Sequence, residues 1–146
     1  MIKSFRGQLK NNSTERIRLS TNDGLTGYKI HKFSIIQKSP GAAGTDNEGL
    51  VQVWSVEPGS VAQTIDFRAP TLLGIGYYTG NPSSHQNPND MIIIFDNTKF
   101  NQDIFVTYYD VRGVGDAMNY YLELEQVKLD INEATVATLK DMRGRE

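Results

Sequence analysis

The two histidines, His31 and His85, have the plainest capacity for acid–base chemistry, because imidazole titrates near neutral pH without help from its surroundings. His31 stands between Ile30 and Lys32 in a stretch with strand character, which favours an exposed or hydrogen-bonded histidine. His85 lies in a polar segment, where it could contact a ligand or simply be solvated. Neither histidine has sequence neighbours that suggest catalysis.

Oxygen ligands for calcium could come from two segments, Asp46-Asn47-Glu48 and the group Asn87, Asn89 and Asp90. Neither segment follows the order of an EF-hand loop or an aspartate-rich repeat, and surface turns use the same residue types. The turn interpretation is therefore favoured over a structural calcium site.

Gly113-Val114-Gly115-Asp116 lacks the Lys-Ser/Thr of a phosphate loop and the third glycine of a dinucleotide fingerprint, so it is interpreted as a hairpin loop. No Gly-x-Ser-x-Gly is present, and the absence of cysteine excludes thiolate catalysis and disulfides. Paired-carboxylate chemistry needs convergence in space, and nothing in the sequence favours it. We therefore expect a protein that is not an enzyme and that carries no metal or cofactor.

Three Tyr-Tyr pairs are the residues best suited to binding: Tyr77-Tyr78, Tyr108-Tyr109 and Tyr120-Tyr121. Adjacent residues of a strand point to opposite faces, so one tyrosine of each pair should lie outside the core. An exposed tyrosine or the single tryptophan, Trp54, could anchor a protein interface or stack on a sugar ring. The competing interpretation, that the outer tyrosines pack beneath loops or between sheets, has comparable weight.

The chain has 146 residues and a formal net charge of −2, with 38% hydrophobic and 22% charged residues. This size and composition predict one folded domain over residues 1–146. The charge balance argues against nucleic acid as a partner, and no apolar run is long enough for a membrane span. Charge appears at once after Met1 with no apolar segment following, so we expect no secretory signal and synthesis in a host cytoplasm.

Strand character dominates residues 1–129, with period-two alternation between turn signals. The apolar run Met91–Phe95 predicts a central strand covered on both faces, whereas Lys38–Gly49 and Gly80–Asp90 predict loops. Phase changes predict a bulge near His31 or Lys32 and a bulge or bend in the last strand. The expected strands are Ile2–Leu9, Arg16–Ser20, Tyr28–Gln37, Leu50–Val56, Val61–Phe67, Met91–Phe95, Ile104–Val111 and Met118–Leu129.

Residues 130–146 change to helical spacing. Asp130 with Glu133 three residues later predicts a capping box, and apolar positions recur before Gly144 at Ile131, Ala134, Thr138, Leu139 and Met142. A helix this short is marginal alone, so it must dock on the sheet or on another subunit. The fold class expected is all-β: an antiparallel β-sandwich, with a jelly roll as one form, and a short C-terminal α-helix.

Four stretches of the chain carry a resemblance to known proteins: Thr21–Ile30, Phe95-Asp96-Asn97 with Asn101–Ile104, Asn119–Glu125, and Asn132–Asp141. In these stretches the chain resembles small proteins of tailed bacteriophages, particularly those that infect marine bacteria. The resemblance implies a virion structural role, such as a capsid decoration protein, a minor head protein or a tail component.

The leading hypothesis is a viral structural protein, located in the virion, that binds capsid or tail proteins and forms a homo-oligomer. The alternative is a carbohydrate-binding β-sandwich that uses Trp54 or tyrosines together with loop Asp and Asn residues. Neither hypothesis involves nucleic acid or a membrane. The candidate interaction surface comprises Tyr77, Tyr78, His85, Tyr109, Tyr121, Leu139 and Met142.

Overall fold

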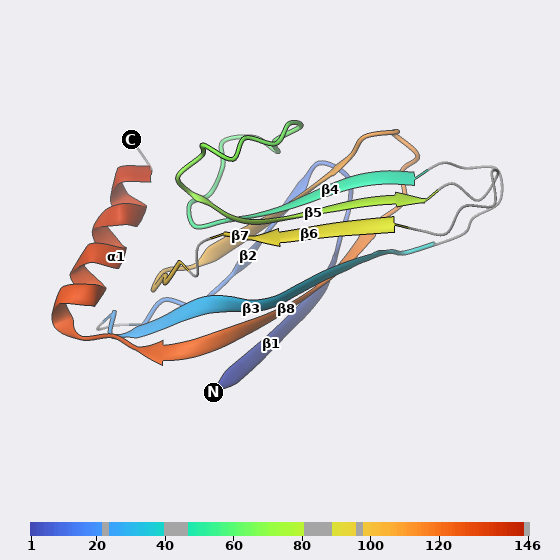
Figure 1. Cartoon of the computed structure of the whole chain (residues 1–146). Helices are drawn as coiled ribbons and strands as arrows, with labels where there is room; N and C mark the ends of the chain where they lie inside the picture. Colours follow the sequence, from blue (N-terminus) through green and yellow to red (C-terminus); the bar gives the residue numbers. More distant parts are fainter. Residues whose placement is uncertain (22–23, 40–46, 81–88, 96–97, 145–146) are drawn as a thin grey trace.

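The computed structural model describes the chain apart from residues 22–23, 40–46, 81–88, 96–97 and 145–146. Eight β-strands precede one α-helix in this described part (Figure 1). The elements are β1 (Ile2–Leu9), β2 (Ser13–Ile17), β3 (Thr26–Gln37), β4 (Asn47–Trp54), β5 (Leu72–Gly80), β6 (Asn89–Ile94), β7 (Ile104–Asp110), β8 (Met118–Lys128) and α1 (Ile131–Gly144).

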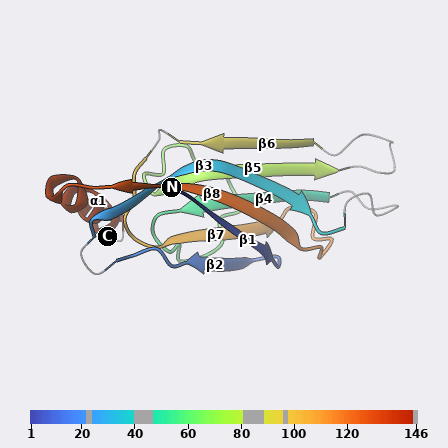
Figure 2. The ribbon, with the colours of Figure 1, turned by 90° about the horizontal axis from the view of Figure 1, so that it is seen from below.

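The strands form two antiparallel sheets that pack face to face. A three-stranded sheet has the order β1-β8-β3, and a five-stranded sheet has the order β2-β7-β4-β5-β6; we call them the small sheet and the large sheet. Figure 2 shows the small sheet lying across the large one, with α1 at one end of the sandwich. The predicted class, an all-β sandwich with a short C-terminal helix, is confirmed.

The pairing of the strands is nested along the chain. β1 pairs with β8, β2 with β7 and β4 with β5, which is the arrangement produced by folding one long hairpin over itself in a jelly roll. β6 departs from this scheme, because it pairs with β5 and lengthens the large sheet instead of joining β3 in the small one.

The core lies between the sheets and follows the alternation read from the sequence. On β8, Met118, Leu122 and Leu124 are fully buried. Opposite them, Val51 of β4 and Val106 of β7 are also fully buried. Because successive strand residues point to opposite faces, one set of alternate positions in each strand supplies the core.

The predicted bulge in β3 is confirmed. The pairing with β8 shifts register between Ile30 and Lys32, so His31 is the extra residue and lies exposed. A bulge allows the inward phase to change from Ile30 to Phe33. The last strand has no bulge of its own, since the register shift belongs to β3, and Leu129 lies beyond the end of β8.

Two strand predictions are wrong. Met91–Phe95 is not a central strand, because β6 is an edge of the large sheet and Met91 is 62% exposed. Val61–Phe67 is not a strand but part of the connection between β4 and β5. There, Gln52 Nε2 donates a hydrogen bond to the Thr64 carbonyl, 3.2 Å away, so this connection covers the outer face of the large sheet.

The loop predictions are corrected at two places. Asn47, Glu48 and Gly49 begin β4 instead of ending a loop, while residues 40–46 lie outside the described residues. Similarly, Asn89 and Asp90 begin β6, and residues 81–88 are not described. Neither candidate calcium segment is therefore a plain surface turn over its described length.

Residues 111–117 are not a hairpin loop, because β7 and β8 belong to different sheets. The buried carboxylate of Asp110 organises this crossing. It accepts hydrogen bonds from the backbone N–H groups of Gly113 at 3.1 Å and Gly115 at 2.8 Å. Both glycines have positive φ, a conformation that glycine adopts without steric cost.

Asp103 ties the chain after β2 to the start of β7. Its carboxylate accepts hydrogen bonds from the backbone N–H groups of Leu19 at 2.7 Å and Ser20 at 2.9 Å, and from Arg16 Nε at 2.7 Å. Burial alone would raise the pKa of Asp103, but these hydrogen bonds outweigh burial and lower the pKa to about 2. The folded state therefore favours the charged carboxylate.

We predict that Asp103→Asn lowers the free energy of unfolding at pH 7 by about 2 kcal/mol, from the depression of the pKa. Because the folded-state pKa lies below the unfolded value, this stabilisation is complete above about pH 4 and disappears as the pH falls towards 2. Urea unfolding of both proteins between pH 7 and 2.5 checks this. Asp66→Asn, on an exposed carboxylate, is the control and should unfold like the wild type. A pH-independent difference for Asp103→Asn would contradict the prediction.

Candidate interaction surfaces

The three Tyr-Tyr pairs divide between core and surface. Tyr78, Tyr108 and Tyr120 are buried, whereas their sequence neighbours Tyr77, Tyr109 and Tyr121 are half-buried on the outer faces. Burial raises the pKa of Tyr108 to about 12 and also raises the pKa of Tyr120. The expected alternation therefore holds in the described strands, but Tyr78 is wrong as a surface candidate, because it is only 4% exposed.

The remaining candidates do not form one surface. Tyr77 and Tyr109 lie on either side of Leu50 on the outer face of the large sheet. Tyr121 lies on the outer face of the small sheet, and Leu139 is on α1. The side chains of His85 and Met142 lie outside the described residues. Three separate surfaces replace the single one that was predicted.

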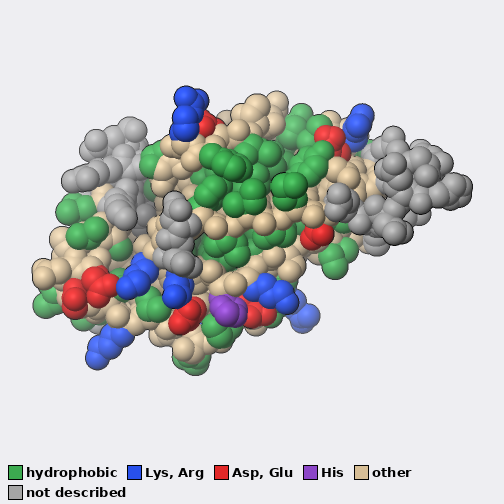
Figure 3. All heavy atoms as spheres, viewed as in Figure 1, with side chains coloured by type: hydrophobic (Ala, Val, Ile, Leu, Met, Phe, Trp, Pro, Cys, Tyr) green, Lys and Arg blue, Asp and Glu red, His purple; other side chains and the backbone are tan. Residues whose placement is uncertain are grey.

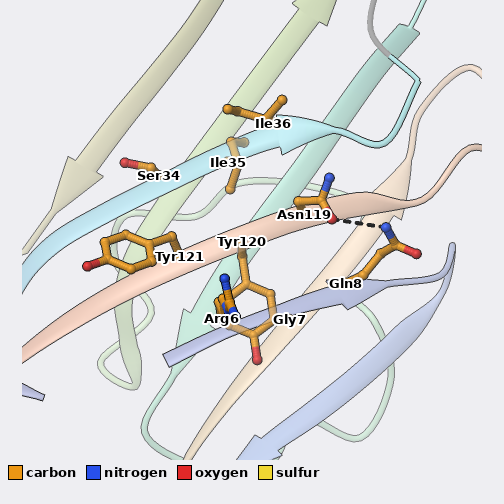
Figure 4. Close-up of a pocket in the computed structure, with 9 residues that line it drawn as sticks. All are labelled: Arg6, Gly7, Gln8, Ser34, Ile35, Ile36, Asn119, Tyr120 and Tyr121. Atoms are coloured by element: carbon orange, nitrogen blue, oxygen red, sulfur yellow. Dashed lines mark hydrogen bonds between the residues drawn. The ribbon is translucent and has the colours of Figure 1, made fainter. Parts of the chain in front are cut away.

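The outer face of the small sheet carries a groove of about 510 Å³ (Figure 4). Among its lining residues, the Gln8 amide donates a hydrogen bond to the Asn119 Oδ1 atom at 2.9 Å. Tyr121 lies on this face and donates its hydroxyl to Glu123 at 2.9 Å, which raises the pKa of Tyr121. The lining residues are Arg6, Gly7, Gln8, Ser34, Ile35, Ile36, Asn119, Tyr120 and Tyr121.

A second surface follows β6, where hydrophobic side chains gather on the face shown in Figure 3. We define the β6 patch as Met91, Ile92, Ile93, Ile94 and Phe67. Met91 is 62% exposed and Phe67 is 59% exposed, while the three isoleucines are half-buried. The Phe67 ring meets the Phe95 ring edge-on, with the centroids 5.1 Å apart. This contact holds the β4–β5 connection beside the end of β6.

Sequence reasoning missed the β6 patch for a definable reason. A run of apolar residues without alternation is typical of a strand covered on both faces, so the sequence predicts Met91–Phe95 at the centre of a sheet. The same run marks an edge strand whose faces are partly open. The length of the run cannot distinguish these positions, because sheet order depends on pairing between distant segments.

The helix docks through small residues and leaves larger ones outside. Ala134 and Ala137 are each 7% exposed, whereas Ile131 is 75% and Leu139 is 44% exposed. The predicted apolar positions therefore divide, because Ala134 docks on the sandwich whereas Ile131 and Leu139 stay outside. The predicted N-terminal cap is present, since Asp130 Oδ1 accepts a hydrogen bond from the Glu133 N–H at 2.7 Å.

Asn101 fastens α1 to the sandwich. This residue is fully buried, and its Nδ2 lies 3.0 Å from the Gly24 carbonyl, 3.3 Å from the Ala134 carbonyl and 3.0 Å from Thr138 Oγ1. One amide therefore connects the loop before β3, the segment before β7 and the helix. An exposed ion pair between Lys99 and Glu133, 3.0 Å apart, lies beside it. The exposed faces of Ile131 and Leu139, with Leu25, line a shallow groove of about 350 Å³.

The side chains that could catalyse a reaction or bind a metal ion lie apart from one another in the described part of the chain. His31 is exposed at the β3 bulge, and no set of at least three His, Asp or Glu side chains there could hold a metal ion. Among the described residues, no helix has the length and apolar character needed to span a membrane. The groove on the small sheet, the β6 patch and the exposed side of α1 offer apolar area and hydrogen-bonding groups to a binding partner.

The chain is an all-β sandwich with jelly-roll-like pairing, and no protein-family model and no curated protein matches its sequence. It is similar to a chain in the solved structure of Cocksfoot mottle virus, with 11% sequence identity and a TM-score of 0.40. The alignment covers 92% of this chain and 100% of that chain. This level of similarity indicates neither function nor partners.

We predict that Asn101→Ala weakens the docking of α1 on the sandwich. The Gly24 carbonyl, the Ala134 carbonyl and Thr138 Oγ1 would all lose their buried hydrogen-bond donor. The free energy of unfolding should fall by about 1–3 kcal/mol, and hydrogen exchange should accelerate across residues 131–139 more than in β8. Lys99→Ala is the matched control on the exposed ion pair, and its effect should stay below about 1 kcal/mol. Thr138→Val, a milder variant, should accelerate exchange in the same segment. Unchanged helix exchange in both Asn101→Ala and Thr138→Val would contradict the role assigned to Asn101.

Proposed function

We propose that this chain is a non-enzymatic structural protein of a virion, and specifically a bacteriophage capsid decoration protein or another head or tail component. The observation that carries the proposal is the β6 patch, where Met91 near the start of β6 is exposed and Phe67, exposed as well, packs on Phe95 just after the end of β6. Contiguous exposed apolar surface is typical of protein–protein contact sites. The proposed partners are therefore capsid or tail proteins together with further copies of this chain.

Two further features support assembly as the task. The helix α1 directs Ile131, Val136 and Leu139 outward, with exposures of 75%, 54% and 44%. Large apolar residues on a solvent-facing helix surface can serve as contact positions for another chain. Jelly-roll sandwiches are frequent in viral capsids, but they also occur in lectins, so the fold alone does not distinguish these functions. The resemblance to phage proteins favours the virion.

We predict that the protein is present in purified virions of the phage that encodes it, in a constant ratio to a major capsid or tail protein. Assembly at repeated lattice or tail positions requires such a ratio, because each position offers the same contacts. Quantitative mass spectrometry of gradient-purified particles measures it, with a phage-encoded enzyme of the infected cell as the control for contamination. Absence of the chain from purified particles would refute the proposal.

A carbohydrate-binding module is the second candidate, and the groove on the small sheet favours it. Tyr121 provides an aromatic ring there, and Arg6, Gln8, Ser34 and Asn119 provide hydrogen-bonding groups around it. A sugar needs both features, since its C–H face packs on aromatic rings and its hydroxyl groups need hydrogen-bond partners. The carbohydrate-binding function would use the small sheet, whereas the proposed assembly function uses the β6 patch on the large sheet.

If the groove binds a saccharide, the isolated protein should give a specific signal on a glycan array. Tyr121→Ala should then weaken binding about fivefold, because the ring contributes of the order of 1 kcal/mol. Tyr109→Ala is the matched control, as Tyr109 is also half-buried but lies on the large sheet. Absence of glycan binding, or equal losses in both variants, would exclude the second candidate.

A further inference from the structure

Four strands form the edges of the two sheets, and β6 differs from the others in charge. Every edge strand carries backbone groups that can pair with another chain, and charged side chains usually discourage such pairing. β1 carries Lys3 and Arg6, β2 carries Glu15 and Arg16, and β3 carries Lys29 and Lys32. In β6 the only charged residue is Asp90, near its beginning, and the four residues that follow are apolar. The edge of β6 is therefore the least protected against strand addition.

The backbone groups of β6 that face away from the sheet can be identified. Phe95 N–H donates to the Leu73 carbonyl of β5 at 3.0 Å. In an antiparallel pair the hydrogen-bonded positions alternate, so Ile93 and Met91 also direct their N–H and C=O groups towards β5. The N–H and C=O groups of Asp90, Ile92 and Ile94 consequently point outward, where no strand of the described chain pairs with them.

The neighbouring sheet leaves this edge open. Figure 2 shows β6 as the outermost strand, lying beyond β3 of the small sheet. The inward-facing side chains Ile92 and Ile94 pack against the core, yet both remain half-buried. On the outer face Met91 is 62% exposed. An added strand would thus meet free backbone groups in the middle and apolar side chains on both faces.

We propose that the occupant is a second copy of this chain, whose β6 pairs antiparallel with the first about a two-fold axis at Ile92. In this register Asp90 pairs with Ile94 of the second copy, Ile92 with itself and Ile94 with Asp90. Every outward-facing backbone group of the three residues then has a partner. On the outer face, Met91 lies opposite Ile93 of the second copy. The large sheets of the two copies become continuous.

Charge favours this antiparallel self-pairing. The two Asp90 carboxylates lie at opposite ends of the paired segment, four residues apart, which is about 13 Å along a strand. At physiological ionic strength this separation exceeds the screening length of about 8 Å, so repulsion between them is weak. Parallel pairing in the same register would place the two carboxylates side by side. The inference rests on the proposed assembly function and specifies one of its contacts.

Sedimentation of the full chain over a range of concentrations tests this proposal. The wild type should form a dimer, and Met91→Lys should raise its dissociation constant about tenfold or more, because each edge then carries an unpaired charge in the apolar contact. Ile36→Lys is the matched control: Ile36 is 59% exposed, close to the 62% of Met91, but lies on the small sheet. This control should dimerise like the wild type.

Cross-linking tests the register. Because the chain has no cysteine, Ile92→Cys places one thiol of each copy at the axis, where Cα atoms of a hydrogen-bonded pair are about 5.5 Å apart and within reach of a disulfide. Oxidation should give a covalent dimer, whereas Ile36→Cys should not. A wild-type chain that stays monomeric would overturn the dimer. If that monomer is nevertheless present in virions and Met91→Lys prevents its incorporation, β6 binds a different viral protein, and the structural function stands without self-pairing.

Discussion

The packing of the two inner sheet faces against each other is the constraint on which the rest of the structure depends. The alternate residues Met118, Leu122 and Leu124 of β8 bury completely against the large sheet. Gly49 shows how close the sheets approach, since a Cβ atom there would lie 2.5 Å from Met118 Cε and 3.0 Å from Tyr108 Cε1. Burial of this apolar surface stabilises the sandwich and dictates which face of each strand is free for other contacts.

The sheets are unequal in width, and this asymmetry connects the fold with the proposed function. The addition of β6 to the large sheet leaves this apolar strand at the edge of the sandwich, where the small sheet covers it only in part. The outer face of the large sheet is covered in part by the β4–β5 connection through Gln52. Exposed apolar side chains therefore remain at the β6 side and on α1, where the proposed contacts would form, while the small sheet keeps an open groove.

The local pattern of residues was sufficient to predict the strands in which apolar and polar residues alternate regularly. β1 begins and ends at the predicted residues, and the tyrosine alternation and the bulge at His31 follow from side-chain period alone. The same pattern gave wrong predictions where the burial of a residue depends on a distant segment that lies over it. Val61–Phe67 has strand-like composition but covers a sheet, and Met91–Ile94 lies at an edge. Asn101 was missed because an isolated asparagine carries no signal of the three distant groups that it binds.

The sequence by itself determined the class of fold, the terminal helix with its Asp130 cap and the division of each tyrosine pair into an inner and an outer member. These features depend on residues only a few positions apart, so local steric and hydrophobic preferences decide them. Only the tertiary structure decided the strand order, the exposure of the β6 patch and the docking of α1 through Asn101. Each of these depends on which distant segments pack together, and the same local pattern is compatible with several such arrangements.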